Sequence, residues 1–208
     1  MMKKTILTLL AMVLLFSVCI GHAESNNRAL VVYFDYSENM GDLTGMTVDA
    51  ITSASLNAAT ENTQGNLQVM AHTISESTGA DVYSIHVEET HTPRYLDMVQ
   101  DASTAQKENR QYTVIDLPAD FGGYDTIYLG TPVWHAQLPQ QVASFLQQVD
   151  WSGKKVIVFG IHLGSSWGRN LTQIQELQPN AEVIGSITVH AGQSNEETRT
   201  EMSDYLTE

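Results

Sequence analysis

Three short segments of the sequence combine residue types that can hold a ligand. They span residues 62–67, 130–136 and 160–168, and none of them contains a lysine or an arginine. The first opens a helical pattern, and the other two follow runs of apolar residues. Each mixes glycine with hydroxyl, amide, imidazole or indole groups, so together they can serve both a phosphate and a planar ring.

The segment at residues 62–67 lies at the start of the first strong helical pattern. A helix presents free backbone N–H groups and the positive end of its dipole at that point, which suits a phosphate. The candidate ligands are Thr63, Gln64, Gly65, Asn66 and Leu67. A simple N-terminal turn without a ligand explains the same residues equally well.

The second segment places an indole and an imidazole just beyond a predicted strand. Trp134 offers a flat apolar face on which a planar ring can stack, and His135 adds a hydrogen bond or a titrating neighbour. We expect Thr131, Pro132 and Val133 to line the same site. The alternative is that the tryptophan only covers the core.

The third segment offers a rival chemistry, because residues 164–168 satisfy the G-x-S-x-G pattern of serine hydrolases. Ser166 is the nucleophile of that pattern, and an acid, Glu176 or Glu182, and then His190 follow in hydrolase order. Against an esterase, residues 161–163 separate the predicted strand from the serine, whereas a nucleophile elbow turns directly out of its strand. The histidines beyond the first residues are scattered, with no metal-binding motif and no cysteine partner, so we expect no metal.

The N-terminus reads as an export signal rather than as part of the fold. Lys3 and Lys4 precede an apolar run of fifteen residues from Ile6 to Ile20, and small residues up to Ala23 provide a cleavage point. We therefore expect a signal peptide at 1–23 and a protein outside the cytoplasm, periplasmic or at the cell surface. An uncleaved anchor or a lipid on Cys19 is the alternative, and only then is a membrane involved.

Cleavage leaves 185 residues, which suit one domain at 24–208. Eight basic residues then face 24 acidic ones, a formal charge of −16. Such a charge repels nucleic acid and anionic membranes, and it favours a basic partner protein.

Strand and helix patterns alternate along this domain. Near-continuous apolar runs indicate strands that are covered on both faces. The predicted strands are 29–34, 81–87, 125–129, 155–159 and 182–189. Helical spacing covers 67–74, 95–102, 142–149 and 171–177, and a capping box at Ser194 and Glu197 opens a last helix. The alternation predicts a doubly wound α/β sheet, interrupted only by a long insert at 36–61 after the first strand.

In such a sheet the ligand lies beyond the carboxyl ends of the strands, where the three segments gather. The element order resembles that of the flavodoxin-like family, above all in the blocks at 124–134 and 150–156. This resemblance implies a five-stranded parallel sheet in the order 2-1-3-4-5 and FMN as the cofactor. It places Gly65 and Asn66 in the phosphate turn.

The resemblance also assigns residues around the isoalloxazine ring. Pro132 and Trp134 match the second loop of the family, and the third loop matches at Gly164, Ser165 and Gly168. The phosphate turn departs from the family by its lack of hydroxyl groups, and Ser37 in the insert is the candidate replacement donor.

The resemblance favours an electron carrier with a basic redox partner. A reductase that also seats NAD(P)H or a quinone is the alternative, followed by a flavin-free binding module. Because the three loops lack cations, we expect a bound flavin to have a low reduction potential.

Overall fold

The computed structural model describes residues 28–40, 65–92 and 94–207, and its centre is a parallel sheet of five strands. The strand order is β2-β1-β5-β6-β7. These strands are β2 (Asp81–Ser84), β1 (Ala29–Tyr33), β5 (Thr126–Pro132), β6 (Lys155–His162) and β7 (Glu182–His190). The predicted doubly wound sheet and its order 2-1-3-4-5 are confirmed.

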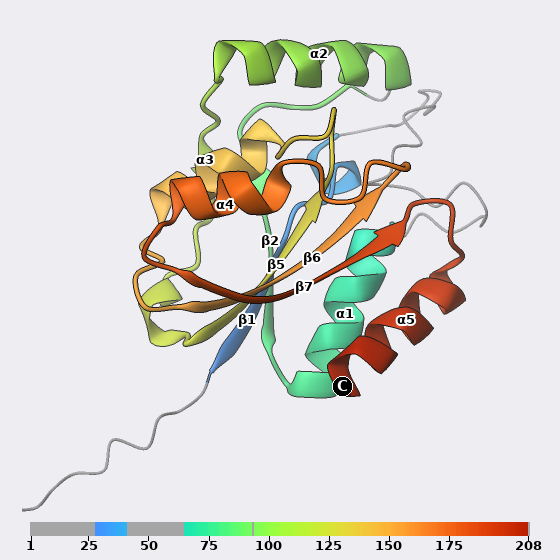
Figure 1. Ribbon diagram of the computed structural model, residues 1–208. Helices are drawn as coiled ribbons and strands as arrows, with labels where there is room; N and C mark the ends of the chain where they lie inside the picture. The colour runs from blue at the N-terminus through green and yellow to red at the C-terminus, as the bar shows by residue number, and fades with distance from the viewer. Residues whose placement is uncertain (1–27, 41–64, 93, 208) are drawn as a thin grey trace, which may run out of the picture.

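Helices cover both faces of this sheet (Figure 1). One face carries α1 (Asn66–Thr78) and α5 (Asn195–Thr207), which pack against each other, and the other carries α3 (Gln140–Gln148) and α4 (Asn170–Leu177). The central strands are therefore buried on both sides, which explains why their sequences are continuously apolar.

Local sequence signals set two helix ends, and the one at the start of α5 is the predicted capping box. Gly79 follows α1 with a φ of 72°, a left-handed conformation that glycine adopts without strain. At the start of α5, the Glu197 carboxylate accepts hydrogen bonds from the backbone N–H and the hydroxyl of Ser194, both at 2.8 Å. The Ser194 hydroxyl in turn accepts a hydrogen bond from the Glu197 N–H at 3.2 Å, which completes the capping box.

The predicted strand at 81–87 is wrong as one element. It divides into β2 and β3 (His86–Val87), and β3 pairs antiparallel with β4 (Val114–Ile115) in a separate two-stranded sheet. The cause is the buried Asn39 in the 3₁₀ helix η1 (Ser37–Asn39). Its side chain donates to the Ile85 carbonyl at 3.0 Å and accepts from the Val87 N–H at 3.0 Å, so a side chain takes over the backbone pairing there.

Two predicted strands were too short at their carboxyl ends. Thr131 and Pro132 pair with Gly160 and Ile161, so β5 and β6 continue together past the predicted loop starts, and β6 ends at His162. The loops at this edge of the sheet are consequently shorter than the sequence suggested. They begin at Val133 and Leu163.

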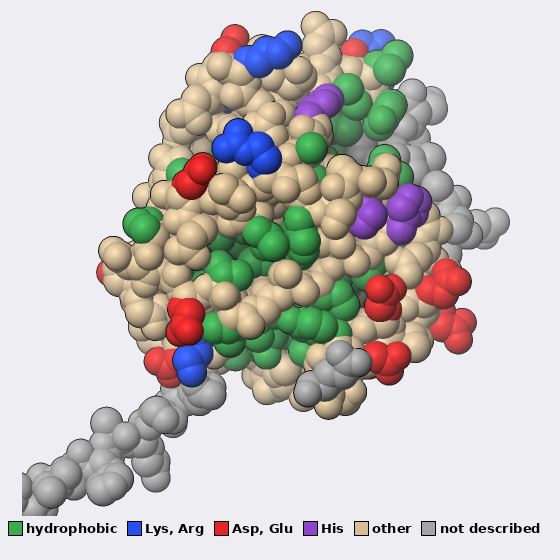
Figure 2. Space-filling view, in the orientation of Figure 1, with side chains coloured by type: hydrophobic (Ala, Val, Ile, Leu, Met, Phe, Trp, Pro, Cys, Tyr) green, Lys and Arg blue, Asp and Glu red, His purple; other side chains and the backbone are tan. Residues whose placement is uncertain are grey.

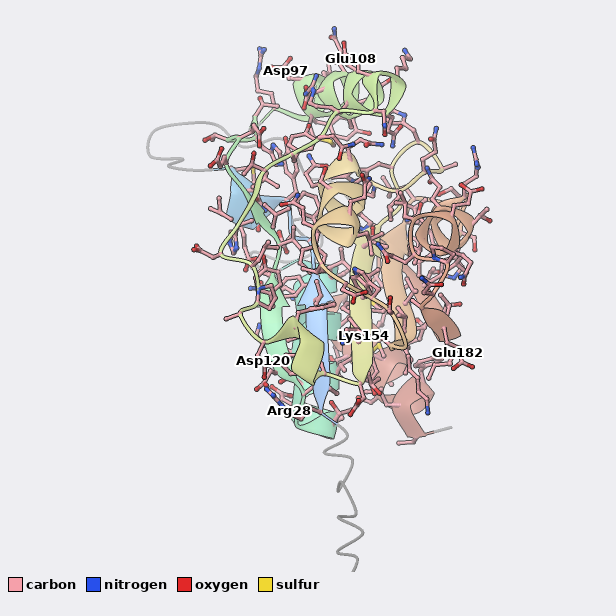
Figure 3. All side chains as sticks on the ribbon, turned by 90° about the vertical axis from the view of Figure 1, so that its left-hand side faces the viewer. Arg28, Asp97, Glu108, Asp120, Lys154 and Glu182 are labelled. Carbon is pink, nitrogen blue, oxygen red and sulfur yellow. The ribbon has the colours of Figure 1, made fainter. Side chains whose placement is uncertain are left out.

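Helix α2 (Tyr95–Glu108) does not lie flat on the sheet. It packs against α3 and stands beyond the carboxyl ends of the strands (Figures 1 and 3). Arg28 and Asp120, whose side chains lie 2.6 Å apart beside the 3₁₀ helix η2 (Phe121–Gly123), mark the opposite end of the molecule in Figure 3. Of the helices in the described ranges, none has the length and apolar character to cross a membrane.

We predict that Gly130→Ala destabilises the fold by about 1–3 kcal/mol, because a Cβ at this position in β5 would lie 2.4 Å from the Phe159 ring and 2.7 Å from the Tyr33 Cβ. Gly122→Ala is the matched control, since a Cβ there meets nothing within 4 Å. Urea denaturation of both variants measures the difference. Equal stabilities would contradict the packing at the centre of the sheet.

Candidate ligand-binding site

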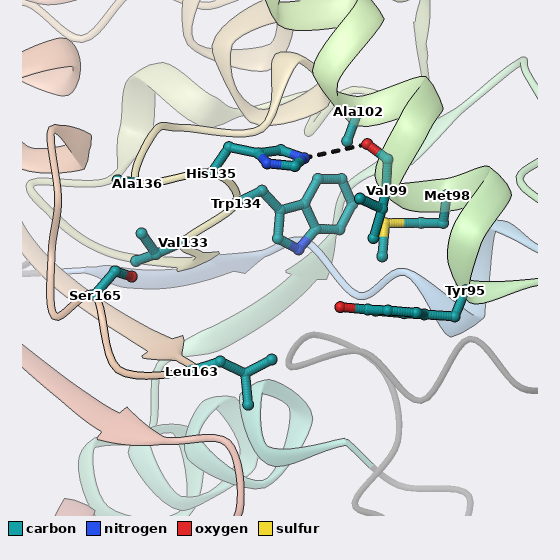
Figure 4. A pocket seen from close by; sticks show the side chains of 10 residues that line it. All are labelled: Tyr95, Met98, Val99, Ala102, Val133, Trp134, His135, Ala136, Leu163 and Ser165. Carbon is teal, nitrogen blue, oxygen red and sulfur yellow. Dashed lines mark hydrogen bonds between the residues drawn. The ribbon is translucent and has the colours of Figure 1, made fainter.

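A cavity of about 240 Å³ lies beyond the carboxyl ends of the strands, between α2 and the loops that follow β5 and β6 (Figure 4). Its wall includes Tyr95, Met98, Val133, Trp134, Leu163 and Ser165. Four of the candidate residues, Val133, Trp134, His135 and Ser165, therefore come together here, at the sheet edge where a doubly wound protein binds its ligand. Thr131 and Pro132 lie within β5, outside this wall.

The loop after β5 is a tight turn from Trp134 to Gln137. The backbone N–H and carbonyl groups of these two residues form two mutual hydrogen bonds, at 3.0 and 2.9 Å. His135 and Ala136 between them have φ values of 49° and 57°. Two left-handed residues in succession define a type I′ turn, which usually contains Asn and Gly. A histidine and an alanine adopt it only when their surroundings hold them there.

The surroundings do hold this turn, from two sides. The Ala136 carbonyl accepts a hydrogen bond from the Arg169 N–H at 2.8 Å, just before α4. On the other side, two residues of α2 contact the turn. The Val99 carbonyl accepts a hydrogen bond from the His135 ring at 3.1 Å, and the Gln106 amide donates one to the Trp134 carbonyl at 3.0 Å. The turn thus links α2 to the start of α4.

Trp134 is on a loop, as predicted, but it is only 7% exposed. Its indole packs edge-on against Phe34 and Tyr36, with ring centroids 5.7 and 5.6 Å apart. It therefore both covers the core and lines the cavity, so the two interpretations drawn from the sequence are not exclusive. The indole face is therefore less exposed than a loop position suggested, because Phe34 and Tyr36, which follow β1, enclose it.

The indole N–H of Trp134 is buried and has no hydrogen-bond partner in the described part of the chain. In Figure 4 the indole nitrogen is turned toward the space between Leu163 and Tyr95. Buried donors almost always have a partner, and one that faces a cavity without a partner indicates a missing acceptor.

The loop after β6 contributes to the cavity at its beginning. Leu163 is 61% exposed at the rim, and Ser165 adds a hydroxyl group to the wall. Gly164 has a φ of 106°, which only glycine adopts readily. Gly168, by contrast, faces the Ala136 carbonyl and supports the turn instead of lining the cavity.

The esterase alternative finds no support in this geometry. Ser166 has a φ of 48°, but across the described residues no hydrogen bond connects its hydroxyl to a histidine. The His190 Nδ1 accepts the Gly192 N–H at 3.0 Å, and its ring contacts His162. Within the same residues there is also no group of three or more potential metal ligands.

The start of α1 is more enclosed than the sequence suggested. Gly65 precedes the helix in an extended conformation, and Leu67 is fully buried. The Asn66 amide donates to the Ala191 and Gln193 carbonyls, each at 3.3 Å, so it ties α1 to the loop after β7. Thr63 and Gln64 lie outside the described residues, and ligand binding at this turn stays a prediction.

Ser37, the candidate replacement donor, is engaged by a residue that the sequence reasoning missed. Its backbone N–H and its hydroxyl both donate to the Asp35 Oδ1, at 2.8 and 2.6 Å. The other oxygen of Asp35 is buried without a partner among the described residues. Burial, and then the nearby Glu38 carboxylate, raise the pKa of Asp35 to about 7. The sequence did contain a signal for this residue, since Asp35 is an acidic residue that closely follows the apolar run at 29–34.

The doubly wound parallel sheet, with a cavity beyond the carboxyl ends of its strands, places the chain among the open α/β proteins. Within that class, the family model described as Flavodoxin matches residues 56–205. The chain belongs to the flavodoxin family.

Solved structures support the same fold. A protein from Bacteroides eggerthii and one from Bacteroides uniformis, both assigned to the flavoproteins, are 18% identical with TM-scores of 0.62, over 88% of this chain and 99% of theirs. A flavoprotein from Lactobacillus acidophilus, solved in complex with FMN, is 17% identical with a TM-score of 0.55, over 78% of this chain and 93% of that chain. No curated protein sequence matches the chain.

We predict that Gly168→Ala destabilises the turn at Trp134. A Cβ on Gly168 would lie 2.4 Å from the Ala136 carbonyl oxygen, and the φ of 52° adds strain. Gly153→Ala, with a φ of 73° and nothing within 4 Å of the new Cβ, carries the strain alone. Gly168→Ala should therefore lose about 1–3 kcal/mol more in denaturant unfolding. Equal losses in the two variants would show that the contact with the turn is not tight.

We predict a pH-dependent stability from Asp35. Since its native pKa of about 7 lies above the usual 3.8, the native state holds this proton longer than the unfolded state, and stability falls as the pH rises from about 4 to 7. The free energy of unfolding of Asp35→Asn lacks this pH dependence. Its difference from that of wild type should therefore grow, in favour of the variant, by on the order of 2 kcal/mol from pH 5 to pH 8. Urea denaturation at both pH values checks this. A stability difference that does not change with pH would contradict it.

Proposed function

We propose that the protein binds FMN in the cavity beside Trp134 and carries electrons to a partner protein. The observation that carries this proposal is the buried, unpartnered indole N–H of Trp134, which faces the cavity. The cavity lies where Phe34 after β1 meets Trp134 after β5, the point at which the strand order reverses. Doubly wound proteins bind their ligands there.

The lining residues fit the ring of a flavin. Val133, Met98 and Leu163 give apolar contacts, while the Trp134 N–H and the Ser165 hydroxyl offer polar ones. The cavity volume of about 240 Å³ is below the roughly 300–1,000 Å³ of sites that enclose a whole ligand, so it suits the ring portion. The FMN complex of the similar Lactobacillus protein supports the choice of flavin.

FMN would supply the electron-transfer chemistry, and the protein would hold it and set its potential. None of the described residues that line the cavity is a lysine or an arginine. The negative charge that a flavin gains on reduction therefore finds no cation in this wall, which supports the expectation of a low potential.

The acidic surface supports a basic partner protein. Glu196, Glu197 and Glu201 lie in the first half of α5, and Figure 2 shows acidic side chains gathered over this helix. Complementary charge of this kind accelerates the encounter of two redox proteins. Based on the apolar N-terminal run, we further propose that the protein works outside the cytoplasm.

Titration with FMN, followed by flavin fluorescence, tests the site. Wild-type protein should quench the fluorescence saturably, and Leu163→Ala at the rim should weaken binding about three- to tenfold through lost apolar contact. The control is Ile184→Ala, which removes a similarly exposed aliphatic side chain from β7 outside the cavity wall and should leave affinity unchanged. No saturable quenching, or equal effects of the two variants, would refute the proposed site.

We predict that bound FMN is harder to reduce than free FMN. A spectroscopic redox titration should place its midpoint potential below that of the free cofactor, because the described cavity wall holds no cation. Leu163→Lys, which introduces a cation at the rim, should raise the potential. A bound flavin that is easier to reduce than free FMN would contradict the electrostatic argument.

A further inference from the structure

We propose, on the basis of the flavin site above, that the described corner after β1 disfavours the phosphate of a flavin, so that this protein does not favour FMN over riboflavin. The reason is the segment directly after β1, where two carboxylates, Asp35 and Glu38, lie close to the start of α1. The ring portion of the site fits a flavin, but this corner does not fit a phosphate.

The hydroxyl group nearest to the end of β1 is already engaged. Both donors of Ser37, its backbone N–H and its side-chain hydroxyl, are directed to the Asp35 Oδ1. A phosphate would have to compete with a carboxylate that is fully buried and held at 2.6 Å by that hydroxyl. The donors of this segment thus stabilise a protein anion rather than a ligand anion.

Glu38 brings a second negative charge to the first turn of α1. Its carboxylate accepts a hydrogen bond from the Gln68 amide at 3.3 Å, and Gln68 is the third residue of the helix. The Tyr33 hydroxyl at 3.1 Å and the Ser84 hydroxyl hold it there. A carboxylate beside a helix N-terminus interacts favourably with the helix dipole. The positive potential that would attract a phosphate is therefore already offset by Glu38.

No cation compensates these two acids in the part of the chain that the structure describes. Its salt bridges involve Arg28, Arg94, Arg110 and Arg169, and none of them reaches Asp35 or Glu38. The second oxygen of Asp35 is also without a hydrogen-bond partner there, although the side chain is fully buried. At pH 8, above the pKa of Asp35 of about 7, the charge at this corner is consequently negative, and a dianionic phosphate would be repelled.

The same acids leave the ring portion of the site unaffected. Neither of them lines the cavity beside Trp134. Their effect should therefore depend on the charge of the ligand tail and be absent for riboflavin, which has the same ring and ribityl chain but no phosphate.

The experiment measures the dissociation constants of FMN and riboflavin for the full-length protein at pH 8, where the phosphate is a dianion. Wild type should bind riboflavin at least as tightly as FMN. Glu38→Gln should tighten FMN binding about tenfold and leave riboflavin binding unchanged, and Asp35→Asn should act in the same direction while keeping an oxygen acceptor for Ser37. Glu182→Gln is the control, since it makes the same charge change at the amino end of β7 and should not alter the ratio.

Wild-type protein that prefers FMN over riboflavin tenfold or more would overturn this inference while leaving the flavin site intact. An unchanged FMN-to-riboflavin ratio in both Glu38→Gln and Asp35→Asn, with folding verified by thermal denaturation, would overturn it as well. If neither flavin binds to any of the proteins, the proposed function itself fails, and this inference fails with it.

Discussion

The backbone contact between the Ala136 carbonyl and the Arg169 N–H is the constraint on which the candidate site depends. This bond, at 2.8 Å, fixes a type I′ turn whose two central residues are not glycine. It is possible only because Gly168 has no side chain where the two loops approach. The loops after β5 and β6 are therefore joined, and the position of Trp134 follows from this contact.

Helix α2 completes this unit from the other side. Its Val99 carbonyl accepts a hydrogen bond from the His135 ring, and its Gln106 amide donates one to the Trp134 carbonyl. These two bonds hold α2 beyond the carboxyl ends of the strands instead of on a face of the sheet. The cavity exists because α2 stands there as a third wall. The site therefore has two different environments. The cavity wall beside Trp134 is mostly apolar, whereas the segment after β1 holds the carboxylates of Asp35 and Glu38.

Those parts of the fold that local rules decide could be predicted from the sequence. Apolar runs indicated the five strands. Gly79 is typical of a helix end, and Ser194 with Glu197 is typical of a helix start. Each of these signals acts within a few residues. The division of residues 81–87 could not be predicted, since it depends on Asn39, more than forty residues earlier in the chain.

The candidate site was predictable in composition but not in detail. Val133, Trp134 and His135 converge with Ser165 of the third loop at one cavity, whereas Thr131 and Pro132 stay within β5. The burial of Trp134 depends on Phe34 and Tyr36, and the loss of Ser37 as a free donor depends on Asp35. Both are matters of packing after β1, and neither helix nor strand periodicity carries that information.

The most direct test of the account is the indole N–H signal of Trp134 in a two-dimensional ¹⁵N–¹H NMR spectrum, recorded as FMN is added. Trp134→Phe assigns the signal, and the indole of Trp151, packed between Phe121 and Phe145 in the core, is an internal reference. We predict that the Trp134 signal shifts progressively to saturation while that of Trp151 stays in place. Binding of FMN without any shift of the Trp134 signal would contradict the account.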